Sequence, residues 1–563
     1  MGGGDCRDNV YNCADTPNPL PVAQTVWLEE MTWMDVRDAL AGGKTTAIVP
    51  TGGIEPNGPW LALGKHNYVL RSTCAATARL LETAICTPII KLVPEGSIEP
   101  KRGHMRSPGT LSLRETTFEA VLIDVARSLK THGFEYIVFI GDSGGNQHGQ
   151  RAVAERLNAE WNGSPVLAHV QEYYDYAGVA AHMAHRGLVS GQRDGLHDDP
   201  VITLSMFHSN PGSVRYDKRV AAGLATIDGV SIADRVNSLE LARDIVAFRA
   251  VQTADAIKKA IANGGTLPTE PRPAANGPSN QASERPAPDP RSMGGGACDV
   301  NPYNCVDHPN PLPATDTVWL EEMTWMDVRD ALAKGTTTAI IPTGGIEPNG
   351  PWLVTGKHNY VLRTNCDTIA RDLGNAVCAP VIELVPEGGI EPPTGHMRSP
   401  GTLSLRRETF EAVLTDVARS LKVHGFTQIV LIGDSGGNRT GMENVATALT
   451  REWAGDAVAV HIPEYYRAPP GTPNVLNDLG VTTEDTETDG LHDNPAITLN
   501  MMLDDPRSVR WSERVATGQA AIDGVSIADL GQSLQLGQRV ADARATRTAA
   551  VIRTRLSLSD LQD

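Results

Sequence analysis

Two hydrophobic periods alternate along this chain. Short apolar runs over residues 45–49, 88–93, 135–140 and 166–170 have the length and β-branched content of buried strands. Apolar residues spaced three and four apart over residues 27–40, 68–81, 115–131, 151–161 and 232–261 predict helices, with Thr32 as an N-cap of the first. Because strands alternate with helices, we expect an α/β fold with three αβα layers and a mainly parallel sheet.

The whole pattern occurs twice. The segment from Gln24 to Trp33 returns as the segment from Asp316 to Trp325, and the correspondence continues through Glu464. This period is far longer than that of a solenoid repeat, so it predicts two homologous domains in tandem, residues 1–262 and 293–563. Residues 263–292 are rich in Pro, Gly, Ser and Asn and predict a disordered linker. Whether evolution or a cloning step joined the two copies stays open.

Composition excludes some partners. The formal net charge is −18, with 49 basic and 67 acidic residues and no basic stripe, which argues against nucleic-acid binding. The apolar runs are well short of the roughly 20 residues that span a bilayer, so we expect no membrane partner.

The eight cysteines form two matching sets. Cys6 and Cys13, and likewise Cys298 and Cys305, lie in Pro- and Asn-rich arms, which predicts a short-loop disulfide in each arm. Free thiols are the alternative. Oxidised arms favour an exported protein, periplasmic or secreted, whose leader is absent from this sequence; a cytoplasmic protein is the alternative.

A polar loop follows the first predicted strand of each copy. It runs from Gly52 to Asn67 and carries Glu55, Asn57 and His66. In a parallel α/β sheet, loops at the carboxyl ends of strands hold ligands. A carboxylate, an amide and an imidazole suit a metal ion or a polar substrate.

The loop also resembles a known family motif. Its sequence Glu-Pro-Asn-Gly-Pro-Trp-Leu-Ala-Leu-Gly-Lys-His, starting at Glu55, is similar to the Glu-x-His-Gly-Pro-His-Leu-Pro-Leu motif of the creatininase (creatinine amidohydrolase) family, which an Asp follows. Residues 104–110 resemble the family's His-x-x-x-Pro-Gly-Thr, residues 141–146 its Asn-Gly-His-Gly-Gly-Asn, and residues 194–197 its Gly-His-Ala-Gly stretch. The resemblance covers nearly all of each half.

The resemblance implies an amidohydrolase acting on a non-peptide, cyclic or linear amide C–N bond in a small molecule, with a two-metal site. Of the implied ligands only Glu55 is unchanged; Asn57, His66 and Ser143 stand where the family has His, Asp and His. We therefore expect a divalent ion, zinc being favoured over manganese or iron, with one or two ions per domain left open. The alternative is a relative that binds a small molecule without metal or catalysis.

The candidate residues are paired between the copies. The expected metal ligands are Glu55, His66, Asp142, Glu347, His358 and Asp434. The expected substrate-binding residues are Asn57, Trp60, His104, Ser143, Asn349, Trp352, His396 and Ser435. The expected catalytic residues are His197 and His492, matching the family's proton-transfer histidine, and Glu172 and Glu464, which end a strand.

Structural alternatives accompany these assignments. Asp142 or Ser143 could be a helix N-cap, and His197 a structural loop residue. Lys65, before His66, is expected in solvent, with binding of an anionic substrate group as the alternative. The tryptophans, Trp60 and Trp352, and the cysteine-bearing arms are also candidates for subunit contacts. The resemblance further implies a homo-oligomer, here a trimer of two-domain chains that recreates six domains.

Overall fold

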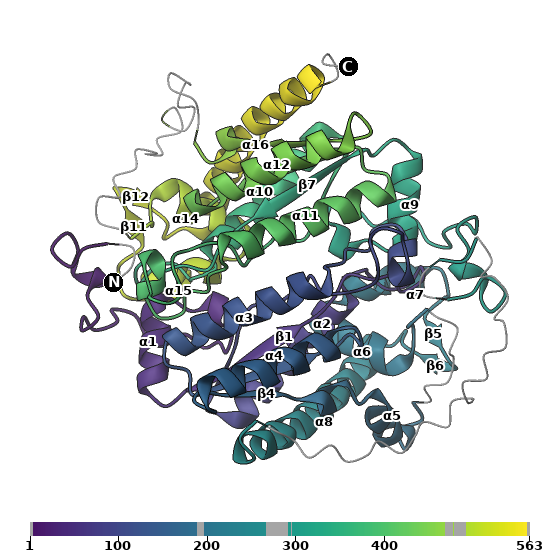
Figure 1. Ribbon diagram of the computed structural model, residues 1–563, viewed down its shortest axis with the longest axis horizontal. Helices are drawn as coiled ribbons and strands as arrows, with labels where there is room; N and C mark the ends of the chain where they lie inside the picture. The colour runs from purple at the N-terminus through teal and green to yellow at the C-terminus, as the bar shows by residue number, and fades with distance from the viewer. Residues whose placement is uncertain are drawn as a thin grey trace.

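A computed structural model describes residues 4–188, 196–265, 291–293, 296–467, 477 and 491–559. Each half contains a four-stranded sheet whose strands are all parallel. Figure 1 shows the two halves side by side, each with helices over its sheet. In the first half the strand order is β2 (Ala84–Cys86), β1 (Thr46–Thr51), β3 (Tyr136–Gly141), β4 (Val166–His169). In the second half it is β8 (Ala376–Cys378), β7 (Thr338–Thr343), β9 (Gln428–Gly433), β10 (Val458–His461).

Helices follow the strands in the same order in both halves. The first half contains α1 (Trp33–Ala41), α2 (Lys65–Leu81), α3 (Glu115–Thr131), α4 (Asn146–Trp161), α5 (Tyr176–Ala184), α6 (Pro200–Ser209), α7 (Tyr216–Ala221) and α8 (Arg235–Ala262). The second contains α9 (Trp325–Ala333), α10 (Lys357–Leu373), α11 (Arg407–His424), α12 (Arg439–Trp453), α14 (Pro495–Asp504), α15 (Trp511–Ala516) and α16 (Leu530–Ser559). Two short hairpins complete the described elements: β5 (Thr226–Ile227) with β6 (Val230–Ser231), and β11 (Ala521–Ile522) with β12 (Val525–Ser526).

Alternation along the buried strands produces the three layers. Ile48 and Val138 pack in one core cluster with apolar residues of α2 and α8. Their neighbours in the chain, Ala47 and Ile137, point to the opposite face and pack with residues of α3 and α4. The predicted αβα fold, present twice, is therefore confirmed.

The sequence misassigned one strand. The run over residues 88–93 is not a strand, and Ile90 makes only an isolated bridge to Thr51. Pro88 lacks the N–H that a ladder needs. The second strand is the shorter segment Ala84–Cys86, paired with β1.

The sequence predicted the start of one helix correctly and the start of another wrongly. Thr32 caps α1 in a capping box with Asp35, as expected, although residues before Thr32 form a separate 3₁₀ turn, η2 (Leu28–Glu30). The second helix, α2, begins at Lys65 rather than in the predicted region near Tyr68. His66 therefore lies in the first turn of a helix.

All eight cysteines are paired. The predicted disulfides Cys6–Cys13 and Cys298–Cys305 are confirmed. Two further disulfides, Cys74–Cys86 and Cys366–Cys378, tie α2 to β2 and α10 to β8. Each of these closes a short loop, worth about 3 kcal/mol on the chain-entropy model. Four disulfides are typical of proteins in an oxidising environment.

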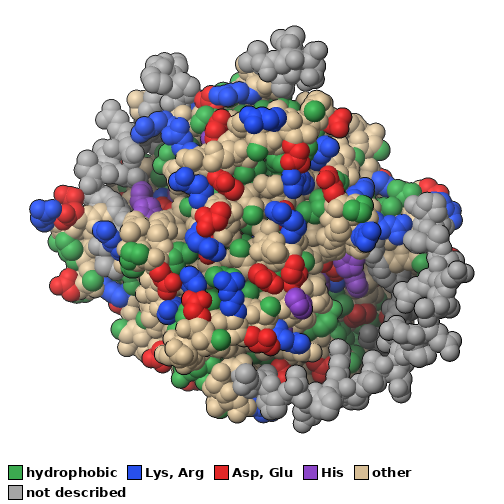
Figure 2. All heavy atoms as spheres, in the orientation of Figure 1, with side chains coloured by type: hydrophobic (Ala, Val, Ile, Leu, Met, Phe, Trp, Pro, Cys, Tyr) green, Lys and Arg blue, Asp and Glu red, His purple; other side chains and the backbone are tan. Residues whose placement is uncertain are grey.

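The outer surface fits the composition. Figure 2 shows basic and acidic side chains interspersed over one face, without an area of a single sign. Among the described helices, none combines the length and apolar character needed to cross a membrane. The predicted linker, residues 263–292, falls almost entirely outside the described residues.

The two halves share one interface. Figure 1 shows α3 and α11 side by side between them, and a single core cluster contains residues of both, including Phe118 and Phe410. The Arg114 side chain donates to Asp416 at 2.7 Å, and Arg406 donates to Asp124 at 2.7 Å in the pseudo-symmetric contact. The two domains therefore form a pseudo-symmetric pair within one chain.

The cysteine-bearing arms cross to the opposite half. Tyr11 of the first arm meets Trp352 edge to face at 5.5 Å between ring centroids, and Tyr303 of the second arm meets Trp60 at 5.4 Å. Arg510 pairs with Asp35 across the same boundary at 2.7 Å. The tryptophans therefore make inter-domain contacts.

The interface predicts a pH-dependent stability. His132 Nε2 and His424 Nε2 each lie on a backbone carbonyl of the other half, Thr402 O at 2.8 Å and Thr110 O at 2.9 Å. Burial lowers the pKa of His132 to about 4, and burial with the charge of Lys101 lowers the pKa of His424 to about 3. Between these values and about 6.5 the unfolded chain binds more protons than the folded one.

Stability should therefore fall as pH drops below about 6.5, by up to about 1.4 kcal/mol per pH unit for each histidine. We expect the double variant His132→Gln/His424→Gln, which keeps a donor in each contact but cannot titrate there, to lose less stability between pH 6.5 and 4.5. Urea unfolding at each pH measures the difference. Parallel pH profiles for both proteins would contradict the assignment.

Candidate functional site

The Glu55 carboxylate is the centre of a buried cluster. It follows β1, is only 2% exposed, and is the point on which three cationic or ionisable side chains converge. Glu55 Oε1 lies 2.7 Å from Lys65 Nζ and 2.9 Å from His66 Nε2, while Oε2 lies 2.6 Å from His104 Nδ1. Lys65, which we expected in solvent, is only 3% exposed and forms an ion pair with this carboxylate.

His66 is held from behind by Asp142. Its Nδ1 lies 2.8 Å from Asp142 Oδ2. The other oxygen, Asp142 Oδ1, accepts hydrogen bonds from Tyr176 at 2.7 Å and from Arg249 of α8 at 3.0 Å. Both oxygens of Asp142 are thus occupied, so we place it behind the imidazole as a positioning residue and not, as expected, among the ligands.

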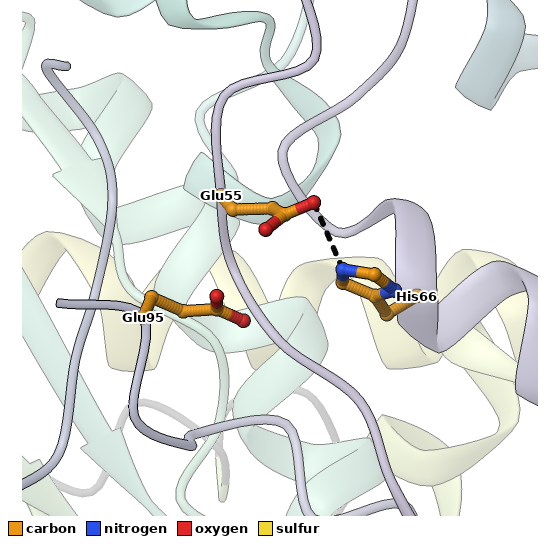
Figure 3. Close-up of side chains that lie close together, drawn as sticks. All are labelled: Glu55, His66 and Glu95. Carbon is orange, nitrogen blue, oxygen red and sulfur yellow. Dashed lines mark ion pairs between the residues drawn. The ribbon is translucent and has the colours of Figure 1, made fainter. Parts of the chain in front are cut away.

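Glu95 is a site residue that the sequence interpretation missed. Figure 3 shows its carboxylate beside Glu55 and His66, and ligand atoms of the three side chains lie within 4.8 Å of one another. Gly53, with φ of +157°, permits this approach, because a Cβ there would lie 1.9 Å from Glu95 Oε1. The available signal was position: Glu95 follows an apolar run at the same sheet edge as Glu55.

Asn57 braces the loop and orients His197. Its Nδ2 donates to the backbone carbonyls of Glu55 at 2.8 Å and Ala62 at 3.2 Å, so only Oδ1 faces His197 Nδ1, at 2.8 Å. An amide oxygen can only accept, which fixes the hydrogen of His197 on Nδ1. His197 is held at φ of +57°, a conformation uncommon for a non-glycine residue and frequent at functional sites.

Charges within the cluster shift its pKa values strongly. Burial alone would raise the pKa of Glu55, but Lys65, His66 and His104 hold it well below its usual range. Burial and the Glu55 charge raise the pKa of Glu95 to about 7. Although burial opposes it, Glu55 and Glu95 raise the pKa of His104 to about 10. Burial and Lys65 lower the pKa of His197 to about 3.

The second half reproduces this geometry. Glu347 Oε1 lies 2.9 Å from Lys357 Nζ and 2.8 Å from His358 Nε2, and Oε2 lies 2.6 Å from His396 Nδ1. His358 Nδ1 lies 2.8 Å from Asp434, which Arg544 contacts at 2.7 Å. Glu387 joins Glu347 and His358 as Glu95 does in the first half.

The remaining candidates lie in varied positions. Ser143 and Ser435 donate to Glu95 at 3.4 Å and to Glu387 at 3.5 Å. His492, like His197, has a positive φ and lies near the central carboxylate, 3.9 Å from Glu347 Oε1. The structure does not bring Glu172 or Glu464 into the cluster: Glu172 is exposed, and Glu464 pairs with Arg555.

The N-cap alternative is wrong. Helix α4 begins after Gly145, and neither Asp142 nor Ser143 caps it with a side chain. Asn349 braces the second loop as Asn57 does the first, donating to Glu347 O and Val354 O. Neither asparagine amide nitrogen is left for a substrate.

Each cluster offers a set of ligands for a metal ion. In the described part of the first half, His66 Nε2 and His104 Nδ1 both lie at ion-pair distance from the Glu55 carboxylate, and Glu95 Oε1 is a buried oxygen without a hydrogen-bond partner. An imidazole backed by a carboxylate is the usual arrangement of a metal-ligating histidine. A second ion does not fit as well, since Asn57 is committed to the loop backbone and Lys65 already neutralises Glu55.

Comparison with known proteins gives one family. A family model described as "Creatininase: Creatinine amidohydrolase" matches residues 29–263 and 321–549, most of each half. No curated protein matches. The family match spans both clusters and all the paired candidate residues.

Several solved structures are similar to one half. A crystal structure of creatinine amidohydrolase (creatininase) is 18% identical and covers 43% of this chain and 98% of its own, with a TM-score of 0.33. A mutant creatininase of "Zn-Zn type" is 20% identical, covering 43% and 99%, with a TM-score of 0.33. A structure described as "Creatininase Mn" is 19% identical, with the same two coverages and TM-score.

The buried ion pairs predict a large cost for removing one partner. Arg249 and Asp142 are 2% and 0% exposed, so Arg249→Met leaves a buried carboxylate short of a partner and should destabilise the protein by about 3 kcal/mol. The matched control is Arg127→Met, whose partner Glu160 is 41% exposed and can be solvated after the change, so the loss should cost under about 1 kcal/mol. Urea unfolding compares them. Equal stabilities would show that Arg249 does not compensate Asp142.

Proposed function

The chain belongs to the creatininase family, and from that premise we propose that each domain hydrolyses a C–N bond of a small cyclic or linear amide with the help of one divalent metal ion. The observation that carries the proposal is a buried cluster in which ligand atoms of Glu55, His66 and Glu95 lie within 4.8 Å of one another, and which Glu347, His358 and Glu387 repeat in the second half. Zinc is the favoured ion, because imidazole and carboxylate ligands suit it; manganese and iron are the alternatives.

Glu55, His66 and Glu95 would hold the ion, with His104 at its edge. When bound, such an ion polarises an amide carbonyl and lowers the pKa of a water molecule. The family resemblance implies two ions, and we propose one because two of the implied ligand positions are Asn57 and Ser143.

The chain's own residues supply the remaining roles. Asp142 accepts the Nδ1 hydrogen of His66, which directs the Nε2 lone pair toward Glu55. Asn57 accepts the Nδ1 hydrogen of His197, which leaves His197 Nε2 able to take a proton from an attacking water and return it to the leaving nitrogen. Lys65 neutralises part of the charge of Glu55.

One observation favours the alternative of a metal-free binding protein. His358 Nε2 lies at hydrogen-bonding distance, 2.8 Å, from Glu347 while its Nδ1 contacts Asp434. A doubly protonated imidazole would satisfy both carboxylates without any ion. Metal and proton thus compete for the same nitrogen, and metal content decides between the two functions.

The decisive experiment measures metal content and amide hydrolysis together. After incubation with zinc and removal of the excess, we expect one ion per domain by elemental analysis. Glu55→Gln and Glu347→Gln should each remove the ion and the activity of one domain, and the double variant should lose activity by about 100-fold or more.

Chelation should abolish hydrolysis and zinc should restore it. The matched control is Glu172→Gln, which changes an exposed carboxylate of the same copy and should leave metal content unaltered. A protein without stoichiometric metal after incubation, and with activity indifferent to chelation, would refute metal-assisted hydrolysis. Complete loss from one single variant would refute independent sites.

The proposal extends to assembly and compartment. We propose that three chains form a six-domain homo-oligomer and that the protein works outside the cytoplasm, which its four disulfides support. The cross-domain contacts of one chain leave the other domain surfaces for contacts between chains.

Light scattering tests the assembly. We expect a mass near three times 60.2 kDa at micromolar concentration. A single-chain mass would refute an obligate trimer and leave the intramolecular pair as the functional unit.

Reduction of the disulfides in a parallel sample should lower the unfolding temperature if oxidation stabilises the fold.

A further inference from the structure

Equivalent segments of the two halves meet at the centre of the domain interface. Residues 89–92 and 381–384 line one small cavity together with side chains of α3 and α11 and of the loops before them. The lining consists of matched pairs: Ile89 with Val381, Ile90 with Ile382, Lys91 with Glu383, Leu92 with Leu384, Leu113 with Leu405, and Val121 with Val413. Each residue thus has its counterpart on the other side of the same cavity.

All but one of these pairs are apolar in both halves. Apolar contacts alone would accept any combination of the two domains: first with second, first with first, or second with second. The exception is the pair formed by Lys91 and Glu383, whose Nζ and Oε1 atoms lie 3.0 Å apart. The two side chains are 21% and 16% exposed, so solvent screens this pair only in part.

Lys91 has a second acidic partner in the other half. Its Nζ lies 3.5 Å from Glu321 Oε2 in the 3₁₀ turn η7 (Leu320–Glu322). By the same pseudo-symmetry Glu383 faces the equivalent turn η2, which carries Glu29, and the charge of Glu383 contributes to a pKa of about 8 for Glu29 after the larger effect of burial. The second domain therefore presents two acids where the first presents one acid and one lysine.

We propose that the Lys91–Glu383 pair specifies the partner of this surface, so that the first domain's interface accepts a second domain and not another copy of itself. If the first domains of two chains paired with each other, the two second domains would be left to pair with each other as well. That second pair would bring Glu383 against Glu383 beside two copies of Glu321, and both Lys–Glu contacts would be lost. Like charges at an interface discriminate against the wrong partner.

The inference concerns recognition rather than catalysis, and it does not depend on the proposed hydrolysis. A single-domain ancestor pairing with its own copy would have had to place identical side chains at this position. A lysine that faces a glutamate at the equivalent position is possible only when the two paired domains differ in sequence.

Partner choice can be measured on the intact protein after its linker is cut. A protease site introduced within residues 263–292 frees the halves from covalent connection without separating them. Nicked protein is mixed with nicked ¹⁵N-labelled protein in urea just below the unfolding transition, until hybrids of labelled and unlabelled halves appear. Native mass spectrometry then distinguishes the three pairings, because the halves differ in mass.

For the unmodified sequence we expect only pairs of a first with a second domain. Glu383→Lys gives both domains a lysine, and Lys91→Glu gives both a glutamate, so each variant should yield all three pairings. The matched control is the charge swap Lys91→Glu/Glu383→Lys, which should restore exclusive pairing. It should also recover the unfolding temperature lost in Lys91→Glu, a second readout if one single variant does not fold.

Two outcomes would overturn the proposal. One is a mixture of all three pairings from the unmodified sequence. The other is exclusive first-with-second pairing in both single variants, which would assign recognition to another unequal contact, such as that of Lys101 Nζ with the Val423 carbonyl.

Discussion

Compensation of buried carboxylates is the constraint around which each domain is built. Glu55 and Asp142 are almost completely removed from water, and an isolated carboxylate in such a place would be strongly unfavourable. Lys65, His66 and His104 converge on the first and His66, Arg249 and Tyr176 on the second. The first turn of α2, the long helix α8 and the loop after β1 are therefore held in register by charge as well as by packing.

Much of the architecture could be predicted from the sequence, because buried strands and helices have a regular spacing of apolar residues. The runs that form β1 and β3 are continuous and rich in β-branched residues, the run that forms β4 is short and mostly apolar, and the duplication gave each assignment a second copy. The shortest strand of the first parallel sheet, Ala84–Cys86, was missed because three residues are too few to show a period. The disulfide partner of Cys86 is Cys74, which lies on a helix whose distance from the strand only the fold defines.

Site residues could be predicted where they lie close together in the sequence. They could not be predicted where only the fold brings them together. Glu55 and His66 stand in one motif, and the structure brings their side chains together at 2.9 Å. Arg249 lies more than a hundred residues from Asp142 along the chain and could not be connected with it by spacing. Lys65 was misjudged because a lysine beside glycine is ordinarily solvated; here the helix begins at that residue and turns its side chain onto Glu55.

The helix that carries each site histidine is tied through the backbone to the opposite half. The amide of Gly64, directly before Lys65 and His66, donates to the carbonyl of Glu321 in the other half at 2.9 Å, and Gly356 donates to Glu29 at 3.1 Å. Any displacement of either 3₁₀ turn is therefore passed to the first turn of the helix that carries the opposite histidine. Separation of the two domains would therefore release the first helical turn of both sites, so that the geometry of each site depends on the presence of the other domain.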